Sequence, residues 1–324
     1  MKKFFALLAA VALSGTAMAQ SAKSDFTIKP VVTVFTNMHQ GLSDAAEDSG
    51  FDLDRAYLGT SFKYKDDFSG TVVLDFGTAG NSTSYNKVAY LKNAYLTYKS
   101  NDFQTSFGLV KTLNFSVQES FWGYRYVAKS YVDQESLASS ADMGITASYK
   151  FSDVFKADVQ MVNGEGYKLI ASDDVDNKYA YGVGLTITPI ESITMRLFYD
   201  INTVEEGEDK TLLSAFVGYK ADSFKIGAEY NMCNNYKNVK DAEVSGFSIY
   251  STVNLNEKFD VYARYDATEG DGSTAAEAKE ESRIWAGLQY NVNKLLKISP
   301  NIQYAKPEGG DNQTYIYLNV QFKL

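Results

Sequence analysis

Apolar and polar residues alternate along most of the chain, as in a β-strand with one apolar and one polar face. Between Ile316 and Leu324 every second residue is apolar, and residues 258–265 and 283–290 show the same alternation. The runs reach about ten residues, which a tilted strand needs to cross a bilayer, whereas strands of soluble sandwiches usually have about five or six. The pattern therefore predicts membrane-spanning strands.

The connections between these strands alternate between short and long. Seven short turns are expected, at residues 65–68, 100–102, 152–153, 189–192, 221–223, 256–257 and 293–294. Eight longer polar stretches lie between them, at residues 38–50, 79–87, 112–139, 164–177, 204–210, 233–242, 267–281 and 306–312. Seven turns and eight loops join sixteen strands, with the short turns at one rim and the long loops at the other.

A sheet in a membrane satisfies its backbone hydrogen bonds only by closing on itself. We therefore expect an all-β fold: a transmembrane antiparallel up-and-down β-barrel of about sixteen strands, placed in the outer membrane of a Gram-negative cell. The apolar face then meets the outer-membrane lipids and the polar face lines the bore. A barrel of this size is too wide to be filled by its wall side chains, which predicts a water-filled lumen.

The first segment has the order of a secretory signal peptide. Lys2 and Lys3 precede an apolar core, and Ala17 and Ala19 form a small-residue cleavage site. We expect a signal peptide at residues 1–19 and the barrel at residues 20–324; a buried N-terminal helix is the alternative. Removing the two lysines takes the formal charge from -9 to -11, because -9 - 2 = -11. So acidic a chain is a poor ligand for nucleic acid, and no nucleic-acid partner is expected.

Composition argues against several other classes. With 14% aromatic residues, 1 Cys and 1 His, the chain does not match a disordered protein, a disulfide scaffold or a zinc enzyme. The alternative of a membrane-embedded hydrolase would depend on His39, but no spacing specifies a nucleophile or an orienting group beside it. Cys233 is expected to be a small residue at a strand end. We expect no enzyme activity and no cofactor.

Four motifs in the first half carry a family resemblance. They are residues 54–59 (DRAYLG), 73–76 (VLDF), 91–99 (LKNAYLTYK) and 107–112 (FGLVKT), followed by an Asn-Gly turn at residues 162–166. They resemble the opening strands of the phosphate-selective porin O and P family. The resemblance covers roughly residues 50–170. It implies a sixteen-stranded porin, commonly a homotrimer, whose third extracellular loop folds into the lumen and narrows it.

The third predicted loop, residues 112–139, is the longest one and follows the fifth strand. Its aromatic residues would be poorly placed in water, which favours packing against the barrel wall over an outward surface loop. A short helix is expected at residues 127–137. The expected constriction residues are Lys111, Glu119, Trp122, Tyr124, Arg125 and Lys129.

Strand parity places charges of both signs on the inner wall. The residues expected to line the lumen include Arg55, Asp75, Asn93, Arg196, Arg264 and Arg283. A phosphate-selective member would instead need a ladder of Arg and a cluster of Lys. Inward aromatic residues are expected to pack beneath the third loop or at the rims; a solute path is the alternative. They are Tyr57, Tyr95, Phe198, Phe216, Tyr262 and Trp285.

The predicted outer loops are acidic, for example at Asp44, Glu47 and Asp48. Such a rim would attract cations and deter phosphate, or it would be a solvated surface bridged to the outer leaflet by divalent cations. The sequence predicts a porin for passive diffusion of small hydrophilic solutes and ions. Two alternatives stay open: a phosphate- or anion-selective porin, and a plugged structural or adhesive barrel without transport.

Overall fold

The computed structural model describes residues 25–78, 87–169, 177–205, 207–271 and 281–324. The expected signal peptide, residues 1–19, lies outside the described residues, as do the centres of the loops expected at residues 79–87 and 267–281. No helix within these ranges is long and apolar enough to cross a membrane.

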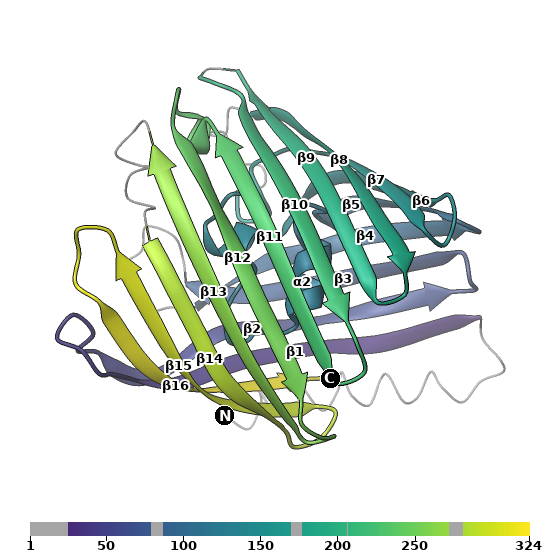
Figure 1. The fold of residues 1–324 in the computed structure, drawn as a ribbon. Helices are drawn as coiled ribbons and strands as arrows, with labels where there is room; N and C mark the ends of the chain where they lie inside the picture. Colours follow the sequence, from purple (N-terminus) through teal and green to yellow (C-terminus); the bar gives the residue numbers. More distant parts are fainter. Residues whose placement is uncertain (1–24, 79–86, 170–176, 206, 272–280) are drawn as a thin grey trace.

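Sixteen antiparallel strands form one closed barrel, in which β1 pairs with β16 and every other strand pairs with its neighbours in sequence (Figure 1). The strands are β1 (Phe26–Gly41), β2 (Ser49–Tyr64), β3 (Phe68–Thr78), β4 (Lys87–Ser100), β5 (Phe103–Lys111), β6 (Ala141–Lys150), β7 (Phe155–Val162), β8 (Asn177–Ile190), β9 (Ile193–Val204), β10 (Lys210–Lys220), β11 (Phe224–Asn234), β12 (Glu243–Asn254), β13 (Phe259–Asp271), β14 (Glu281–Asn291), β15 (Leu296–Pro307) and β16 (Gln313–Lys323). The predicted fold class and strand number are confirmed.

All seven short turns join the strand pairs that the sequence predicted. Several strands run further than expected at the opposite rim. β1 continues to Gly41, because His39 and Gln40 still pair with Gly50 and Ser49 of β2. β13 likewise reaches Asp271, opposite Glu243 of β12.

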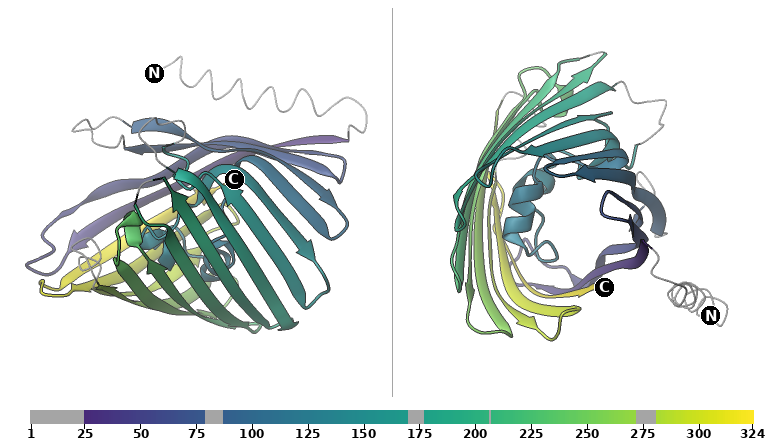
Figure 2. Two further views of the ribbon diagram at one scale, coloured as in Figure 1. Left: turned by 90° about the horizontal axis from the view of Figure 1, so that it is seen from above. Right: turned by 90° about the vertical axis from the view of Figure 1, so that its right-hand side faces the viewer.

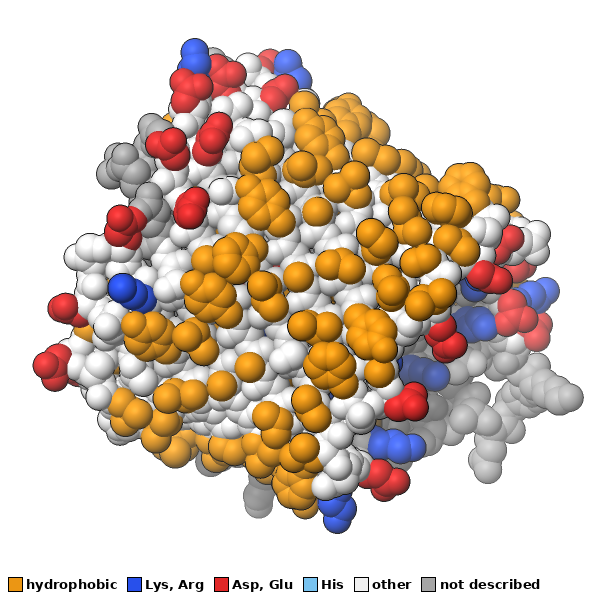
Figure 3. Space-filling model, viewed as in Figure 1, with side chains coloured by type: hydrophobic (Ala, Val, Ile, Leu, Met, Phe, Trp, Pro, Cys, Tyr) orange, Lys and Arg blue, Asp and Glu red, His pale blue; other side chains and the backbone are white. Residues whose placement is uncertain are grey.

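The two faces of the barrel wall differ as a bilayer requires. On β9, Met195, Leu197 and Tyr199 are exposed, whereas the alternating Arg196 and Phe198 are buried on the inside. Apolar side chains spread over the outer face, and charged side chains gather toward its ends (Figure 3). An apolar outer face of this kind is what a transmembrane barrel presents to lipid.

Two β-bulges change which side chains point inward. The β1–β2 register shifts between Phe35 and Thr36, next to Asp54, and the β3–β4 register shifts between Val73 and Leu74, next to Lys92. A bulge inserts one residue into a strand and re-aims the side chains around it. In a regular strand Lys92 and Asn93 would point to opposite faces of the wall. Both side chains are nevertheless buried.

The two-sided wall predicts a large cost for a charge on the lipid face. Leu197→Arg is expected to lower the free energy of unfolding by about 2–4 kcal/mol, the cost of Arg near the bilayer midplane. The measurement is urea unfolding of the barrel in lipid vesicles. Thr194→Arg, which adds the same group on the inner side of β9, is the control and should cost much less; equal costs would contradict this orientation of the strand.

Candidate functional site: the loop inside the barrel

The β5–β6 loop, residues 112–140, folds into the barrel, and we name it the inner loop. Figure 2 shows its helix inside the ring of strands. It contains α2 (Ser116–Trp122) and the single turn α3 (Tyr131–Gln134). Residues of β10, β11, β13, β14 and β16 contact its middle part from one side of the wall. Its two ends bind Lys92 of β4, Gln160 of β7 and Arg196 of β9.

The short helix expected at residues 127–137 is present only in part, as α3 within that range. Only one turn, α3, forms there, because Ser130 is extended before it and Ser136 has a left-handed backbone after it. The longer helix α2 precedes this region and was not predicted. The sequence signal for α2 was Gly123, which ends this helix in the left-handed conformation, as glycine commonly does at a helix C-terminus.

Aromatic side chains attach the inner loop to the wall. Trp122 and Tyr124 are buried, with ring centroids 5.3 Å from Tyr250 and 4.3 Å from Tyr262, respectively. Phe121 packs on Phe216 at 5.2 Å, where a side chain at Gly218 would collide with it. The expectation that inward aromatics pack beneath the loop agrees with the positions of Phe216, Tyr262 and Trp285 in this cluster.

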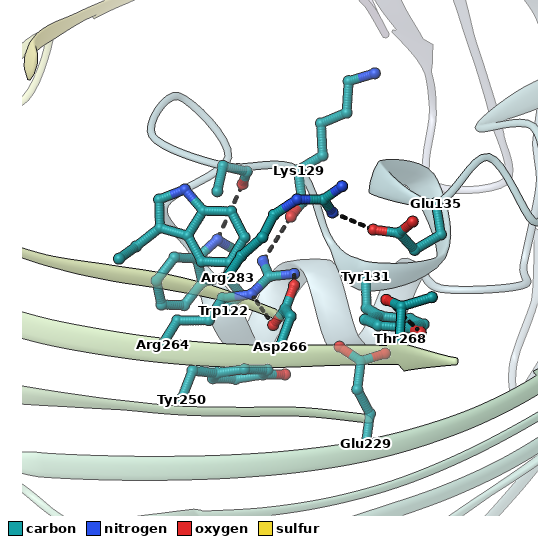
Figure 4. Close-up of polar contacts among 12 residues, drawn as sticks. Trp122, Lys129, Tyr131, Glu135, Glu229, Tyr250, Arg264, Asp266, Thr268 and Arg283 are labelled. Carbon is teal, nitrogen blue, oxygen red and sulfur yellow. Dashed lines mark hydrogen bonds and ion pairs between the residues drawn. The ribbon is translucent and has the colours of Figure 1, made fainter. Parts of the chain in front are cut away.

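Arg264 of β13 is the most enclosed charged group at this contact (Figure 4). Its guanidinium binds both carboxylate oxygens of Asp266 at 2.7 and 2.5 Å. It also donates to the main-chain oxygen of Lys129 and lies between the rings of Trp122 and Trp285, 5.3 and 5.0 Å from their centroids. One side chain therefore joins the wall, the aromatic cluster and the inner-loop backbone.

The second half of the inner loop has its own anchors. The fully buried carboxylate of Glu135 pairs with Arg283, which also pairs with Glu281 at the start of β14. The Tyr131 hydroxyl donates to Thr268 at 3.0 Å, and a side chain at Gly246 would occupy the space of that hydroxyl. Burial raises the pKa of Tyr131 well above its ordinary value, so the phenol stays neutral.

The predicted constriction residues occupy four different settings. Arg125 forms ion pairs within the loop, with Glu119 at 2.9 Å and Asp133 at 2.6 Å. Trp122 and Tyr124 belong to the buried cluster, and Tyr124 also lines a cavity near the short turns. Lys129 extends away from Arg264, whereas Lys111 is an exposed residue at the end of β5.

A second cluster of polar side chains lies at the wall formed by β2, β3 and β4. Arg55 lies 3.5 Å from Asp75, which accepts a 2.7 Å hydrogen bond from Tyr167. Lys92 bonds to Ser140 and lies over the Tyr167 ring, with its ammonium 3.7 Å from the centroid. Asn93 is buried, and its amide donates to the Leu109 carbonyl at 3.4 Å.

All five arginines of the chain pair with carboxylates. Arg196 completes the set by binding both oxygens of Asp158 at 2.8 Å and the Leu113 carbonyl at 3.0 Å. Arg196, Arg264 and Arg283 each connect the wall to the inner loop. Their guanidinium groups thus hold the inner loop against the wall.

Cavities lie on both sides of the inner loop. One of about 670 Å³ is lined by Lys220, Lys225 and Lys297 near the short turns, with Asp260. Cavities of about 290 and 240 Å³ lie toward the long loops and share Gln134, Gln303 and Tyr317. We name the 290 Å³ space the outer cavity. Its lining includes Asp52, Asp54, Arg55, Arg125 and Lys129.

Sequence reasoning missed Lys92, Tyr131, Glu135 and Asp54. The Asp54 and Lys92 positions depend on bulges, which parity alone does not reveal. His39, the one histidine, lies 3.4 Å from Asp52 and 3.5 Å from Asp48 and contacts Asn37 at 3.1 Å. Among the described residues no serine hydroxyl bonds to it, and no group of three His, Cys, Asp or Glu side chains could hold a metal ion.

A closed sixteen-stranded barrel with an apolar exterior, a polar interior and an inserted loop defines the class of outer-membrane channel proteins. The chain belongs to the Gram-negative porin family, whose model matches residues 6–324. It is therefore an outer-membrane porin, a passive diffusion channel. Its fold and family are those of channels.

Solved structures share this fold at low sequence identity. OmpT of Vibrio cholerae is 13% identical with a TM-score of 0.68, covering 94% of this chain and 99% of that one. An anion-selective porin from Comamonas acidovorans is 13% identical with a TM-score of 0.68, covering 92% and 100%. The outer membrane channel DcaP of Acinetobacter baumannii is 13% identical with a TM-score of 0.65, covering 94% and 99%. No curated protein sequence matches the chain.

The anchoring role of Arg264 can be tested by removing the charge. Arg264→Met leaves Asp266 buried without its partner and is expected to lower the free energy of unfolding by about 3–5 kcal/mol. Urea unfolding in vesicles measures the change. The double variant Arg264→Met/Asp266→Leu should recover much of that loss, because Asp266 is no longer left as a buried carboxylate without its partner. A single variant as stable as wild type would contradict the assigned role.

Proposed function

We propose that this porin is a general channel for small hydrophilic solutes and ions, narrowed by the inner loop and weakly selective for charge. The pairing of every arginine with a carboxylate is the observation that carries this proposal. A porin that selects phosphate would keep guanidinium donors free for the phosphate oxygens. Here those donors bind the protein's own carboxylates and carbonyls.

The finer resemblance, to the phosphate-selective O and P family, leads to the second candidate function. The 670 Å³ cavity is lined by Lys220, Lys225 and Lys297 with one carboxylate, Asp260, and this excess of positive charge favours an anion-selective porin. The Lys225 ammonium, however, already donates hydrogen bonds to the Phe121 and Trp122 carbonyl oxygens, at 2.6 and 3.0 Å. We therefore place anion selectivity second.

Further parts of the proposal concern processing and assembly. The signal-peptide pattern supports export with cleavage after Ala19. A homotrimer is proposed from the family resemblance. Neither transport nor assembly requires a cofactor in this proposal, because passive diffusion follows the solute gradient.

Planar-bilayer recording of the purified barrel tests these candidates. We expect steady conductance, a reversal potential near zero or slightly toward cations under a KCl gradient, and no block by phosphate. Strong anion selectivity with phosphate block would establish the second candidate instead. A folded barrel that never conducts would favour the plugged structural or adhesive barrel.

Deleting residues 114–136 should raise the single-channel conductance, since the inner loop occupies part of the bore. Circular dichroism and heat-dependent electrophoretic mobility would verify that the deleted form is still a barrel. An unchanged conductance in a folded variant would remove the constriction assignment from the inner loop.

Replacing both Arg125 and Lys129 by Gln should shift the reversal potential toward cations, because two positive charges of the inner loop are lost. Lys63→Gln/Lys150→Gln removes the same charge at exposed short turns, where these lysines pair with Asp66 and Asp153. This control should change the potential far less. Identical shifts in both double variants would mean that Arg125 and Lys129 lie outside the ion path.

A further inference from the structure

The charges around the outer cavity fall into paired and unpaired groups. Arg55 is paired with Asp75, and Arg125 is paired with Glu119 and Asp133. A guanidinium group held by a carboxylate presents little net charge to a solute. Among the lining residues this leaves Lys129 on the loop side of the cavity and Asp52 and Asp54 on the β2 side. The two carboxylates on Arg125 leave one further negative charge on the loop side, on residues that do not line the cavity.

The two sides differ in how their groups are held. Lys129 forms no ion pair with any residue in the described ranges, and its side chain extends away from the anchored backbone carbonyl. Asp54 accepts two 2.9 Å hydrogen bonds from the amide of Asn37, which fix its orientation, and Asp52 is 61% exposed with His39 as its neighbour. The cavity therefore presents one ammonium and two carboxylates from opposite sides.

The remaining lining suits a small polar solute. Gln134 offers amide hydrogen bonds, and Tyr317 offers a ring face with a hydroxyl. A volume of about 290 Å³ accommodates a molecule of amino-acid or dipeptide size, together with water. An anion or a cation alone would satisfy one side and be repelled by the other.

We propose that the outer cavity is a subsite for zwitterionic solutes of amino-acid to dipeptide size. The solute carboxylate binds the Lys129 ammonium, and the solute ammonium binds Asp54, with Asp52 beside it. The two contacts orient the solute dipole at the approach to the inner loop. Binding is weak and exchangeable, as passage requires. This inference rests on the proposed channel function and specifies its preferred solute class.

The experiment compares four solutes of similar size in proteoliposomes at neutral pH: glycylglycine as the zwitterion, N-acetylglycine as the anion, glycinamide as the cation and N-acetylglycinamide as the neutral molecule. Their entry rates are measured by liposome swelling or by uptake of labelled solute. In the wild-type porin glycylglycine should enter about threefold faster than the neutral analogue, the size of effect expected from solvent-exposed ion pairs. Lys129→Gln and Asp54→Asn should each reduce this ratio toward one.

Matched controls come from an exposed pair with the same chemistry. Lys63→Gln and Asp66→Asn make the same charge changes at the β2–β3 turn, where Lys63 and Asp66 lie 2.7 Å apart. Both controls should keep the wild-type ratio. The neutral solute also reports separately on whether the pore is open in every variant.

The outcomes separate this inference from the channel proposal. If no solute enters, the proposed function itself fails. If the neutral solute enters but glycylglycine has no advantage, or if its advantage survives both Lys129→Gln and Asp54→Asn, the zwitterion subsite is wrong while the channel remains. Fastest entry of N-acetylglycine or of glycinamide would also overturn the subsite, showing that one sign of charge dominates the cavity.

Discussion

The hydrogen-bonding demand of the backbone in hydrocarbon governs this structure. A lipid-facing strand cannot leave its N–H and C=O groups unpaired, so the sheet has to close, and pairing of β1 with β16 removes the last free edge. Closure with sixteen strands then creates an interior that the wall side chains cannot fill. The water-filled bore is thus a consequence of pairing the backbone.

A segment inside such a bore needs attachments that hold in the presence of water. The inner loop combines apolar packing with a buried ion pair. Phe121, Trp122 and Tyr124 bury apolar surface against the wall, and Arg264 joins Asp266 to the loop backbone while enclosed by two indole rings. Enclosure matters, because an ion pair held away from water is screened much less than an exposed one. Breaking it by losing one partner leaves a buried charge.

The sequence predicted the barrel well because its determinants are local. A period of two, turn residues at regular intervals and long polar stretches are readable along the chain, and each short turn was found in the structure. The site was less predictable because it depends on contacts distant in sequence. Glu135 meets Arg283, and Tyr131 meets Thr268, only because the barrel brings these strands around the loop. The bulges beside Asp54 and Lys92 also break the parity on which inward positions were assigned.

Pairing also decides which charges are available to a solute. A count of inward-facing residues gives a mixed wall, but the arginines are not equivalent to free cations, since Arg55, Arg196 and Arg264 each face a carboxylate of the same wall. The field that a solute meets therefore comes from the residual groups, whose balance differs on the two sides of the inner loop. Asp52 and Asp54 outnumber Lys129 on the side of the long loops, and three lysines outnumber Asp260 on the side of the short turns. Low-dielectric barrel walls concentrate such fields along the bore. Under the proposed function, selectivity would consequently follow from where charges remain unpaired rather than from their total number.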